Sequence, residues 1–351
     1  MVMATRDAND LRELVDRRLD ELLEQEMGRL HFVGEDGQAT LRAYLVDFIR
    51  TGGKRLRSSF VYWGHRASGG APEDQDAVLA AGCAVELLHA SALLLDDVMD
   101  EAATRRGRVT AHVDLAELHR RMGWWGDPQR FGESVATLLG MLAFTWADAA
   151  LLRGGPGLPE TLEVFTQLRV EIIGGQYLDV ALAARGTGDV EEAARISTYK
   201  SGKYTVERPL HLGHAIAGGE PGLRAVLSAY ALPLGEAFQL RDDVLGVFGD
   251  PALTGKPAGA DLRQGKRTYL TADARKRADR YGVALLDNVH DESDVTAARD
   301  LIAGTGALDA AERRISDLVA QATGALDGAG IPPDACAALI ELAHVATNRS
   351  T

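Results

Sequence analysis

Cysteine is scarce in this sequence of 351 residues, which contains only Cys83 and Cys336. Two thiols cannot build a disulfide framework or a zinc site, so disulfide-rich secreted domains and zinc-binding domains are excluded as classes. Cys83 lies in an apolar stretch and is expected to be a small buried side chain. The scarcity fits a protein of the reducing cytoplasm.

Basic residues are also few: 38 Lys and Arg face 51 Asp and Glu, which gives a formal net charge of -13. No broad basic stripe exists, and this argues against nucleic acid as a partner. The positive charges that stand out are grouped in short blocks. That grouping predicts a small anionic substrate instead.

Long hydrophobic runs are lacking, since no apolar run approaches the roughly 20 residues that a membrane-spanning helix needs. The first 26 residues predict a charged amphipathic helix rather than a signal peptide. The composition, 46% apolar and 25% charged, is that of a globular protein that can bury a substantial core. We therefore expect a protein without a transmembrane segment.

Strand-like alternation of polar and apolar residues is hard to find as well. Almost every periodic stretch predicts a helix, near residues 8–29, 39–51, 56–67, 74–101, 110–121, 131–152, 159–184, 189–201, 203–218, 221–247, 265–281, 292–303, 306–328 and 332–348. Gly- and Pro-rich turns separate these helices, and no linker marks a domain boundary. The prediction is an all-α fold: one domain over residues 1–351, with its core at about 40–350, built as a bundle of long antiparallel helices around a central cavity.

Three aspartates end an apolar stretch in the first half of the chain: Asp96, Asp97 and Asp100. On a helix, Asp96 and Asp100 point the same way one turn apart, and His89 shares roughly that face. Carboxylates there are costly unless a cation neutralises them. Mg²⁺ suits such a set, because it takes one or two carboxylates and leaves positions open for substrate phosphate. The alternative is a solvated helix end with salt bridges to the two arginines that follow.

A second aspartate pair, Asp242 and Asp243, stands on another apolar helical background. Gln239 lies one turn before Asp242 on the same side. Two such sites far apart in the chain, each with basic residues nearby, predict two helices that face each other across one metal-filled cavity.

The block from Thr51 to Arg57 reads Thr-Gly-Gly-Lys-Arg-Leu-Arg at the start of a predicted helix. Its two glycines allow the backbone to approach a ligand closely. Lys54, Arg55 and Arg57 add positive charge beside the helix N-terminus, where anions bind. Beside the aspartate motifs, this block predicts phosphate binding, whereas alone it would indicate an ordinary charged helix start.

Six motifs stand in a specific order. They are Asp96–Asp97–Val98–Met99–Asp100 with Arg105–Arg106–Gly107, the Gly52–Arg57 block, Gly175–Gln176–Tyr177–Leu178–Asp179, Lys200–Ser201–Gly202, Asp242–Asp243, and the tail from Thr254 to Thr268. From about Leu41 to Thr268, and more weakly to the end, the chain resembles the trans-type isoprenyl diphosphate synthases, or polyprenyl synthetases. Among these it is most similar to the bacterial geranylgeranyl diphosphate synthases.

The resemblance implies an isoprenoid synthase fold, a homodimer and a Mg²⁺-dependent prenyltransferase. Such an enzyme condenses isopentenyl diphosphate head-to-tail with an allylic diphosphate. The metal, three ions in this family, would be held by Asp96, Asp100 and Asp242. The catalytic set implied by the resemblance is Asp96, Asp97, Asp100, Lys200, Gln239, Asp242 and Asp243.

The resemblance also divides the substrate-binding residues between two diphosphates. Those implied for isopentenyl diphosphate are Lys54, Arg57, His89 and Arg106. Those implied for the allylic substrate are Arg105, Lys200, Lys256 and Lys266, with Ser201 and Gln239 offering oxygen dipoles to the carbocation. Ser201 stands where the family usually has Thr. Lys203 matches less clearly and is expected at the surface.

Product length should depend on the helix turns before Asp96. Enzymes that make fifteen-carbon products often carry an aromatic residue where this chain has Ser91 and Ala92. Small side chains there predict a longer tunnel, because one helix turn of about 5.4 Å is comparable to a five-carbon unit. Leu88, one turn further, is the expected floor. These residues favour geranylgeranyl diphosphate, with farnesyl or longer products as the alternative.

Two positions depart from the family. Gly246 replaces the third aspartate of the second motif, which leaves Asp242 as the main ligand there. Met141 follows Gly140 where an aspartate is usual. Met141 is the one feature that favours a non-catalytic helical partner subunit, although such subunits usually lose an aspartate motif.

Two further enzyme classes compete with this interpretation. Glu86–His89 and Glu341–His344 both have the Glu-x-x-His spacing of a di-iron carboxylate bundle, which would also need two more facing glutamates. A class I terpene cyclase would share the fold and the first aspartate motif but would not need a second diphosphate site. The aspartate pairs and the basic blocks favour the prenyltransferase over both.

Overall fold

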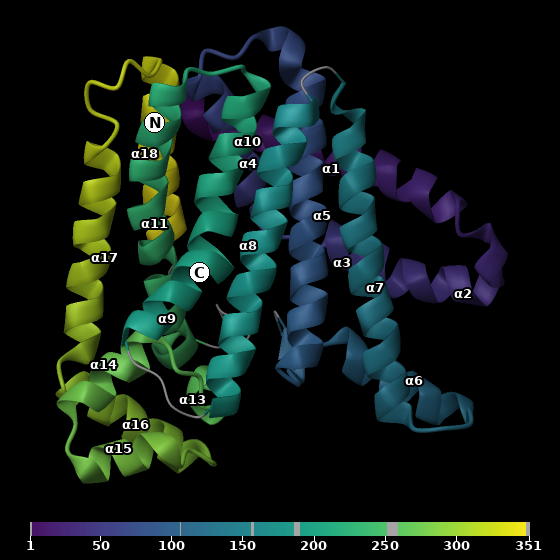
Figure 1. Cartoon of the computed structure of the whole chain (residues 1–351). Coiled ribbons are helices and arrows are strands. Elements are labelled where there is room, and N and C mark those ends of the chain that lie inside the picture. Colours follow the sequence, from purple (N-terminus) through teal and green to yellow (C-terminus); the bar gives the residue numbers. More distant parts are fainter. Residues whose placement is uncertain (1, 106, 156–157, 186–189, 251–258, 349–351) are drawn as a thin grey trace. The chain divides into compact units, whose positions relative to one another are not determined.

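The computed structural model describes all residues except 1, 106, 156–157, 186–189, 251–258 and 349–351 (Figure 1). The described residues are almost entirely helical, which confirms the all-α prediction. Within them, strands β1 (Thr104–Arg105) and β2 (Arg108–Val109) form one short antiparallel hairpin. That hairpin directly follows the first aspartate motif.

Two compact units make up the chain: Met1–Glu163 with Pro209–Gly219 form unit 1, and Val164–Arg208 with Glu220–Thr351 form unit 2. The helices of unit 1 are α1 (Val2–Gly28), η1 (His31–Val33), α2 (Gly34–Leu41), η2 (Arg42–Val46), α3 (Asp47–Arg50), α4 (Leu56–Ala67), η3 (Pro72–Asp74), α5 (Gln75–Met99), α6 (Ala111–Met122), α7 (Pro128–Leu151), η4 (Leu152–Gly154) and α10 (Arg208–Ile216). Those of unit 2 are α8 (Leu158–Arg185, which begins in unit 1), α9 (Val190–Ile196), η5 (Ser197–Glu207), α11 (Pro221–Phe248), α13 (Ala260–Arg263), α14 (Tyr269–Arg277), α15 (Arg280–Asp287), α16 (Glu292–Gly304), α17 (Ala307–Gly324) and α18 (Pro333–Thr347). Two compact units can belong to one domain or to two, so the single-domain organisation stays a prediction.

Helix α5 is the core of unit 1. Every residue from Val78 to Leu88 is buried, as expected for a helix that is apolar on all sides and packs against both α4 and α7 (Figure 1). Cys83 is buried as predicted, and burial raises the pKa of its thiol to about 12. The helix therefore presents its C-terminal aspartates from a firmly packed base.

Helices α4 and α10 touch backbone to backbone. A Cβ atom built on Gly64 would lie 2.4 Å from the carbonyl oxygen of Leu210, and one on Gly213 would lie 2.0 Å from that of Val61. Any side chain at either glycine would push the helices apart, because carbon and oxygen atoms pack no closer than about 3 Å. Two glycines thus anchor the helix that begins with the basic block.

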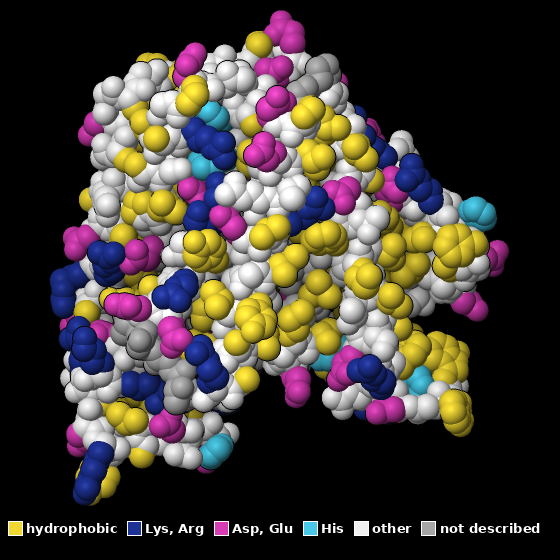
Figure 2. Space-filling view, in the orientation of Figure 1, with side chains coloured by type: hydrophobic (Ala, Val, Ile, Leu, Met, Phe, Trp, Pro, Cys, Tyr) yellow, Lys and Arg dark blue, Asp and Glu magenta, His cyan; other side chains and the backbone are white. Residues whose placement is uncertain are grey.

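Two helical stretches, Pro72–Met99 and Pro128–Gly154, are long and apolar enough to cross a membrane by length and composition alone. This differs from the expectation that no apolar stretch reaches that length. The first has 78% of its most apolar window buried inside the protein, as in a core helix, and the second has 44%. Leu138 and Met141 of α7 are each 57% exposed, and hydrophobic side chains are visible over this helix (Figure 2).

Helix α11 is the centre of unit 2, where it packs against η5, α17 and α18. Gly202 of η5 and Gly235 of α11 meet so closely that a Cβ on Gly235 would lie 2.5 Å from the Cα of Gly202. The buried Tyr230 hydroxyl donates to the carbonyl oxygen of Leu339, 2.6 Å away, and ties α11 to α18. This packing fixes the half of α11 that carries the second aspartate pair.

Two predicted helix boundaries are wrong. Helices 189–201 and 203–218 were expected to be separate, but α9, η5 and α10 run on from one another, with η5 wound as a π-helix. The stretch 265–281 was expected to be one helix, but α14 ends and α15 begins there because the Asp279 carboxylate caps α15, accepting from the backbone N–H groups of Tyr281 and Gly282. The π-helical segment contains Lys200 and Ser201, and such segments often occur at functional sites.

Candidate active site

The first aspartate motif ends α5 in unit 1. The backbone N–H of Asp100 donates to the carbonyl oxygen of Asp96 (2.8 Å), so the helical turn between these residues is complete. Asp96 and Asp100 are half-buried, whereas Asp97 is buried. The predicted spacing of one turn between the two outer carboxylates is therefore present.

Arg105 of β1 holds two of these carboxylates. Its Nε donates to Oδ1 of Asp97 (2.7 Å) and its Nη2 to Oδ2 of Asp96 (3.0 Å). The short hairpin is closed by Thr110, whose hydroxyl donates to the carbonyl oxygen of Ala102 (2.6 Å). The salt bridge considered as the alternative in the sequence analysis is thus present for Arg105, and its contact with a phosphate stays a prediction.

The basic block before α4 divides into structural and accessible members. Arg55 is buried in a left-handed backbone conformation (φ 50°) and donates to Asp16 (2.8 Å), to Glu86 (3.3 Å) and to the carbonyl oxygen of Ile49. Its charge therefore stabilises the fold, and its predicted contribution to phosphate binding is wrong. Lys54 is exposed and Arg57 is half-buried in the first turn of α4, so both stay candidates.

Glu86 serves this same buried ion pair. It also accepts hydrogen bonds from the Ser58 hydroxyl (3.1 Å) and backbone N–H (3.3 Å). Its carboxylate oxygens are thereby engaged in the core, and no group of three or more His, Cys, Asp and Glu in the described part of the chain is arranged to hold a metal. The di-iron interpretation of Glu86 and His89 loses its first ligand, while His89 remains half-buried on α5.

The second aspartate pair lies near the end of α11 in unit 2. Asp242 is half-buried and Asp243 is buried. The sequence spacing places Gln239 on the same side as Asp242. In the structure its amide nitrogen donates to Oδ1 of Asp243 (2.8 Å), so Gln239 positions the carboxylate of Asp243. Asp242 is left as the more accessible carboxylate of the pair, in agreement with its predicted role as the metal ligand.

A third carboxylate, missed at the sequence level, joins this pair. Asp261 of α13 is buried, and its Oδ2 lies 1.9 Å from where a Cβ of Gly246 would be. Asp261 therefore fills the space beside position 246, the place from which the family's third aspartate would project. Its position in the sequence, five residues before Lys266 in the motif tail, was the only available signal.

These neighbours change the titration of Asp243. Burial raises the pKa of Asp243 to about 7, the hydrogen bond from Gln239 acts against this, and the charges of Asp261 and Asp242 add to the rise. The folded protein then binds a proton more tightly than the unfolded chain between about pH 4 and pH 7. Stability of the metal-free protein should fall as the pH rises through this window.

We expect the melting temperature of the metal-free protein to drop between pH 5 and pH 8, and Asp243→Asn to flatten that drop. Asparagine keeps the oxygen that accepts from Gln239 but has no charge to bury. The measurement is thermal unfolding in EDTA at both pH values for the two proteins. Equal pH slopes for both would show that Asp243 is not the titrating group.

Lys200 forms an ion pair within unit 2. Its Nζ lies 2.5 Å from Oδ2 of Asp179, the aspartate that ends the Gly175–Asp179 motif. Helix α8 can approach η5 this closely because Gly175 has no side chain: a Cβ there would lie 2.5 Å from the backbone nitrogen of Lys200. Two predicted motifs are thus joined directly, with Ser201 half-buried next to them.

Lys203 is not at the surface as expected. Its side chain is 16% exposed, and its Nζ lies 3.3 Å from Glu171 and 3.2 Å from Glu207. Arg208 donates to the same Glu171 carboxylate through Nε (2.7 Å) and Nη2 (2.6 Å). Lys203 therefore belongs to a buried ion-pair network that holds η5 against α8.

Of the three remaining predicted residues, Lys266, Arg106 and Lys256, only Lys266 lies within the described part of the chain. Lys266 is half-buried in the turn between α13 and α14, and its backbone N–H donates to the carbonyl oxygen of Asp261 (2.9 Å). Arg106 and Lys256 lie outside the described residues. This backbone hydrogen bond holds Lys266 close to Asp261 in the turn that contains both.

The donor sets fit Mg²⁺. Asp96 and Asp100 offer carboxylate oxygens one helix turn apart, and Asp242 offers one beside two buried carboxylates. Mg²⁺ characteristically binds through one or two carboxylates with waters and substrate phosphates completing its shell, so neither set needs a third side chain. Neither thiolate nor imidazole is required, so these carboxylates suit a hard divalent cation such as magnesium.

Comparisons with known proteins identify the family of the chain. The polyprenyl synthetase family model matches residues 38–303. A short chain isoprenyl diphosphate synthase of Methanothermobacter thermautotrophicus is 33% identical over 279 residues, 78% of this chain and 80% of that protein. A geranylgeranyl diphosphate synthase of Mycobacterium tuberculosis is 32% identical over 293 residues, 80% of this chain and 77% of that one. The solved geranylgeranyl pyrophosphate synthase from Corynebacterium glutamicum, complexed with isoprenyl diphosphate and magnesium, superposes with a TM-score of 0.92 at 38% identity, covering 97% of this chain and 98% of that one.

Proposed function

The chain belongs to the polyprenyl synthetase family, a family of trans-prenyltransferases, and we propose that it makes geranylgeranyl diphosphate with the help of Mg²⁺. The observation that carries the proposal is the state of both aspartate motifs. Each has an accessible, half-buried carboxylate, Asp96 or Asp242, next to a buried one, Asp97 or Asp243. A non-catalytic relative would have no use for both. The accessible Lys54 and the half-buried Arg57 of the basic block support a second diphosphate site, which a single-diphosphate cyclase would not need.

The proposed reaction joins isopentenyl diphosphate to an allylic diphosphate. The allylic C–O bond breaks, and its electron pair leaves with the diphosphate. The double bond of isopentenyl diphosphate attacks the resulting carbocation, and loss of a proton restores an alkene. The departing diphosphate is the proton acceptor, because no strong protein base is present among the predicted site residues.

The side chains of this protein stabilise the leaving group. Mg²⁺ held by Asp96, Asp100 and Asp242, three ions in all, would supply Lewis acidity at the diphosphate oxygens. Arg105 and Lys200 supply fixed positive charge, since both are already held in place by aspartates, at 2.7 Å and 2.5 Å. Preorganised charge of this kind lowers the barrier because it need not reorient as negative charge develops.

Other residues bind and position. Lys54, Arg57 and His89 of unit 1 are proposed to hold the diphosphate of isopentenyl diphosphate, together with Arg106. Lys266 and Lys256 are proposed for the allylic diphosphate. Gln239 acts indirectly, because its amide donates to Asp243 and so orients that carboxylate. Ser201 offers a hydroxyl dipole to the carbocation.

Product length is proposed to follow from the turns of α5 before Asp96. Ser91 is buried, Ala92 is half-buried, and Leu88 is 2% exposed. Ala92→Phe is expected to shift the product to fifteen carbons, because the ring would occupy the space of one five-carbon unit. The matched control is Ala149→Phe. It changes a half-buried alanine of α7, which carries neither aspartate motif.

The test is a product assay of the purified protein with Mg²⁺, isopentenyl diphosphate and each of the five-, ten- and fifteen-carbon allylic primers. A dominant twenty-carbon product that disappears with EDTA supports the proposal, and Ala92→Phe should then give farnesyl diphosphate. A longer ladder would keep the chemistry and move the floor beyond Leu88. No elongation with any primer would contradict the proposal and favour the non-catalytic subunit.

We also propose a cytoplasmic homodimer. The exposed apolar side chains of α7, Leu138 and Met141 among them, support a protein contact on this helix (Figure 2). Met141, the departure from the family, is 57% exposed and is therefore better suited to such a contact than to chemistry.

A further inference from the structure

Four charged side chains form a buried cluster beside η5, the segment that carries Lys200. We call them the η5 cluster: Glu171 of α8, Lys203 and Glu207 of η5, and Arg208, the first residue of α10. None of the four side chains is more than 16% exposed. Two carboxylates balance two cations, and the reaction proposed above uses none of the four.

Glu171 is the centre of the η5 cluster. Its Oε2 accepts from Nε of Arg208 (2.7 Å), its Oε1 accepts from Nη2 of the same arginine (2.6 Å), and this Oε1 also lies 3.3 Å from Nζ of Lys203. Glu207 lies 3.2 Å from the same Nζ and accepts from the hydroxyl of Ser228 of α11 (2.8 Å). Burial alone would lower the pKa of Arg208, but the hydrogen bond to Glu171 and the charges of both carboxylates raise it. The cluster is therefore an ionised network that joins α8, η5 and α11.

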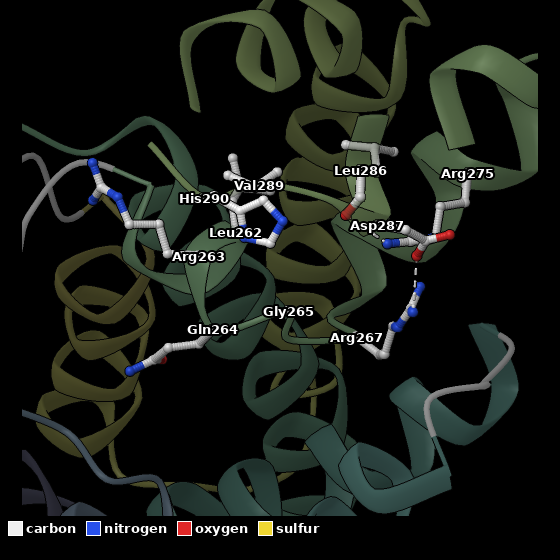
Figure 3. A pocket seen from close by; sticks show the side chains of 10 residues that line it. All are labelled: Leu262, Arg263, Gln264, Gly265, Arg267, Arg275, Leu286, Asp287, Val289 and His290. Atoms are coloured by element: carbon white, nitrogen blue, oxygen red, sulfur yellow. Dashed lines mark hydrogen bonds and ion pairs between the residues drawn. The ribbon is translucent and has the colours of Figure 1, made fainter. Parts of the chain in front are cut away.

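Another group of ion pairs in unit 2 shows the difference that burial makes. Around a cavity of about 180 Å³ at the end of α13, Arg267 and Arg275 both donate to Asp287 (Figure 3). The Asp287 side chain is 38% exposed, so water shares in neutralising these arginines. Ion pairs with such access to water contribute little. The η5 cluster lacks that access, and its charges depend on one another.

Stability does not explain why charges are kept in this interior position. Apolar side chains of similar volume often stabilise a protein core as well as a buried ion pair does, or better. What a buried network supplies instead is one register, because any other register leaves buried charges without partners. The two parallel hydrogen bonds between Arg208 and Glu171 make this requirement strict, since a shift of η5 along α8 would break both.

The same two elements are joined a second time, by Lys200 of η5 and Asp179 of α8. Glu171 and Asp179 are eight residues apart on α8, which is about 12 Å along the helix axis. The earlier carboxylate pairs with the later cations, so α8 and η5 run in opposite directions between the two anchors. Two anchors on one pair of elements fix both the position and the direction of η5.

The winding of η5 makes such anchors necessary. It is a π-helix over the 11 residues Ser197–Glu207, whereas π-helical segments are usually single turns within α-helices. An unfavourable backbone conformation persists where its surroundings over-determine it. Lys200 and Ser201 lie in this segment, so the geometry of both depends on the contacts that hold it.

We propose that Glu171 is a positioning residue: with Lys203 and Arg208 it fixes the register of η5 on α8, and thereby aims Lys200 at the allylic diphosphate. The inference rests on the proposed function, in which Lys200 contacts that substrate. Misplacement of a reacting or binding group by about 1 Å can cost as much as about 100-fold in rate. The effect should be selective, because the residues implied for isopentenyl diphosphate belong to unit 1.

The kinetic test compares Glu171→Gln and Lys203→Met with the wild type. Each should lower kcat/KM for the allylic substrate at least about tenfold, while the KM for isopentenyl diphosphate stays close to its wild-type value. Lys203→Arg keeps the charge and should restore the wild-type values. The matched control is Glu26→Gln, because Glu26 is an equally buried carboxylate that pairs with Arg29 and Arg153 in unit 1. It should lower the melting temperature without changing either kinetic constant.

A second measurement does not depend on turnover. A nearby carboxylate favours the charged form of an amine, and only the neutral form is acylated. Without substrate, Lys200 should therefore react faster with an acylating reagent in Glu171→Gln and Lys203→Met than in the wild type or in Glu26→Gln. Mass spectrometry measures the rate, with the exposed Lys54 as the internal reference.

Unchanged labelling of Lys200 in both cluster variants would overturn the proposal, as would equal kinetic losses for the two substrates. Lys203→Met keeps the test valid if the more buried Glu171 variant does not fold. Faster labelling of Lys200 together with a wild type that makes no product would refute the proposed function and leave the register assignment standing.

Discussion

Asp96→Ala and Asp242→Ala are each expected to lower the turnover of prenyl transfer by about 10²–10³-fold or more, the usual cost of removing one group that stabilises developing charge. Each change removes a proposed Mg²⁺ ligand, and the leaving diphosphate would lose the cation that neutralises it. Both side chains are half-buried, so their truncation opens no cavity in the core. Loss of activity should therefore occur in a folded protein.

Two control variants share the helices of these aspartates. Asp76→Ala removes a surface carboxylate of α5 that pairs with Arg18, and Glu236→Ala removes one of α11 that pairs with Arg314. Exposed pairs contribute little to stability, so both controls should keep full turnover. Circular dichroism should show the same helicity in all four proteins. More than a tenth of wild-type turnover in either aspartate variant would overturn its assignment as a metal ligand.

Local patterns carried most of the fold prediction. Helix α5 was predicted because apolar residues dominate the stretch before the first aspartate motif, and the structure buries residues 78–88 accordingly. The one-turn spacing of Asp96 and Asp100 follows from helix geometry alone, and it holds because the Asp100 N–H still bonds to the Asp96 carbonyl oxygen. Properties that depend on a few neighbouring residues can be inferred from the sequence.

Long-range pairing could not be predicted in this way. Arg55 looks like its neighbours Lys54 and Arg57 in the sequence, yet it alone turns inward to meet Glu86, 31 residues away. Asp261 lies 15 residues after Gly246, and no periodicity links the two positions (261 − 246 = 15). Which of several similar charges is buried depends on the packing of distant segments, and a single sequence does not contain that packing explicitly.

Gly246→Asp, which would complete the family's second motif, is expected to damage the protein instead of improving it. A Cβ at position 246 would lie 1.9 Å from Oδ2 and 2.6 Å from Cγ of Asp261. Asp261 is buried and would have to leave its place, while a new carboxylate would join Asp242 and Asp243. Overpacking and an added buried charge should lower the free energy of unfolding by about 3 kcal/mol in metal-free solution.

Gly246→Ala separates the two causes, since it adds the Cβ without the charge. It should lose less stability than Gly246→Asp, and the difference should shrink when Mg²⁺ is added, because a cation compensates the new carboxylate. Unfolding in urea, with and without Mg²⁺, measures both effects. A Gly246→Asp protein as stable as the wild type in EDTA would show that Asp261 moves aside freely.

The double variant Gly246→Asp/Asp261→Ala tests whether the two positions supply one and the same carboxylate. Alanine at 261 keeps the Cβ but removes the atoms that lie within 3.4 Å of the new side chain, namely Oδ1, Oδ2 and Cγ. If a carboxylate in this space is what the site requires, the double variant should recover stability and turnover that each single variant loses, and the coupling energy should be well above the few tenths of a kcal/mol typical of independent sites. Strictly additive losses would mean that Asp261 is only a packing neighbour. Recovery would instead show that this chain draws its third carboxylate from α13, and that the glycine at 246 is the substitution that makes room for it.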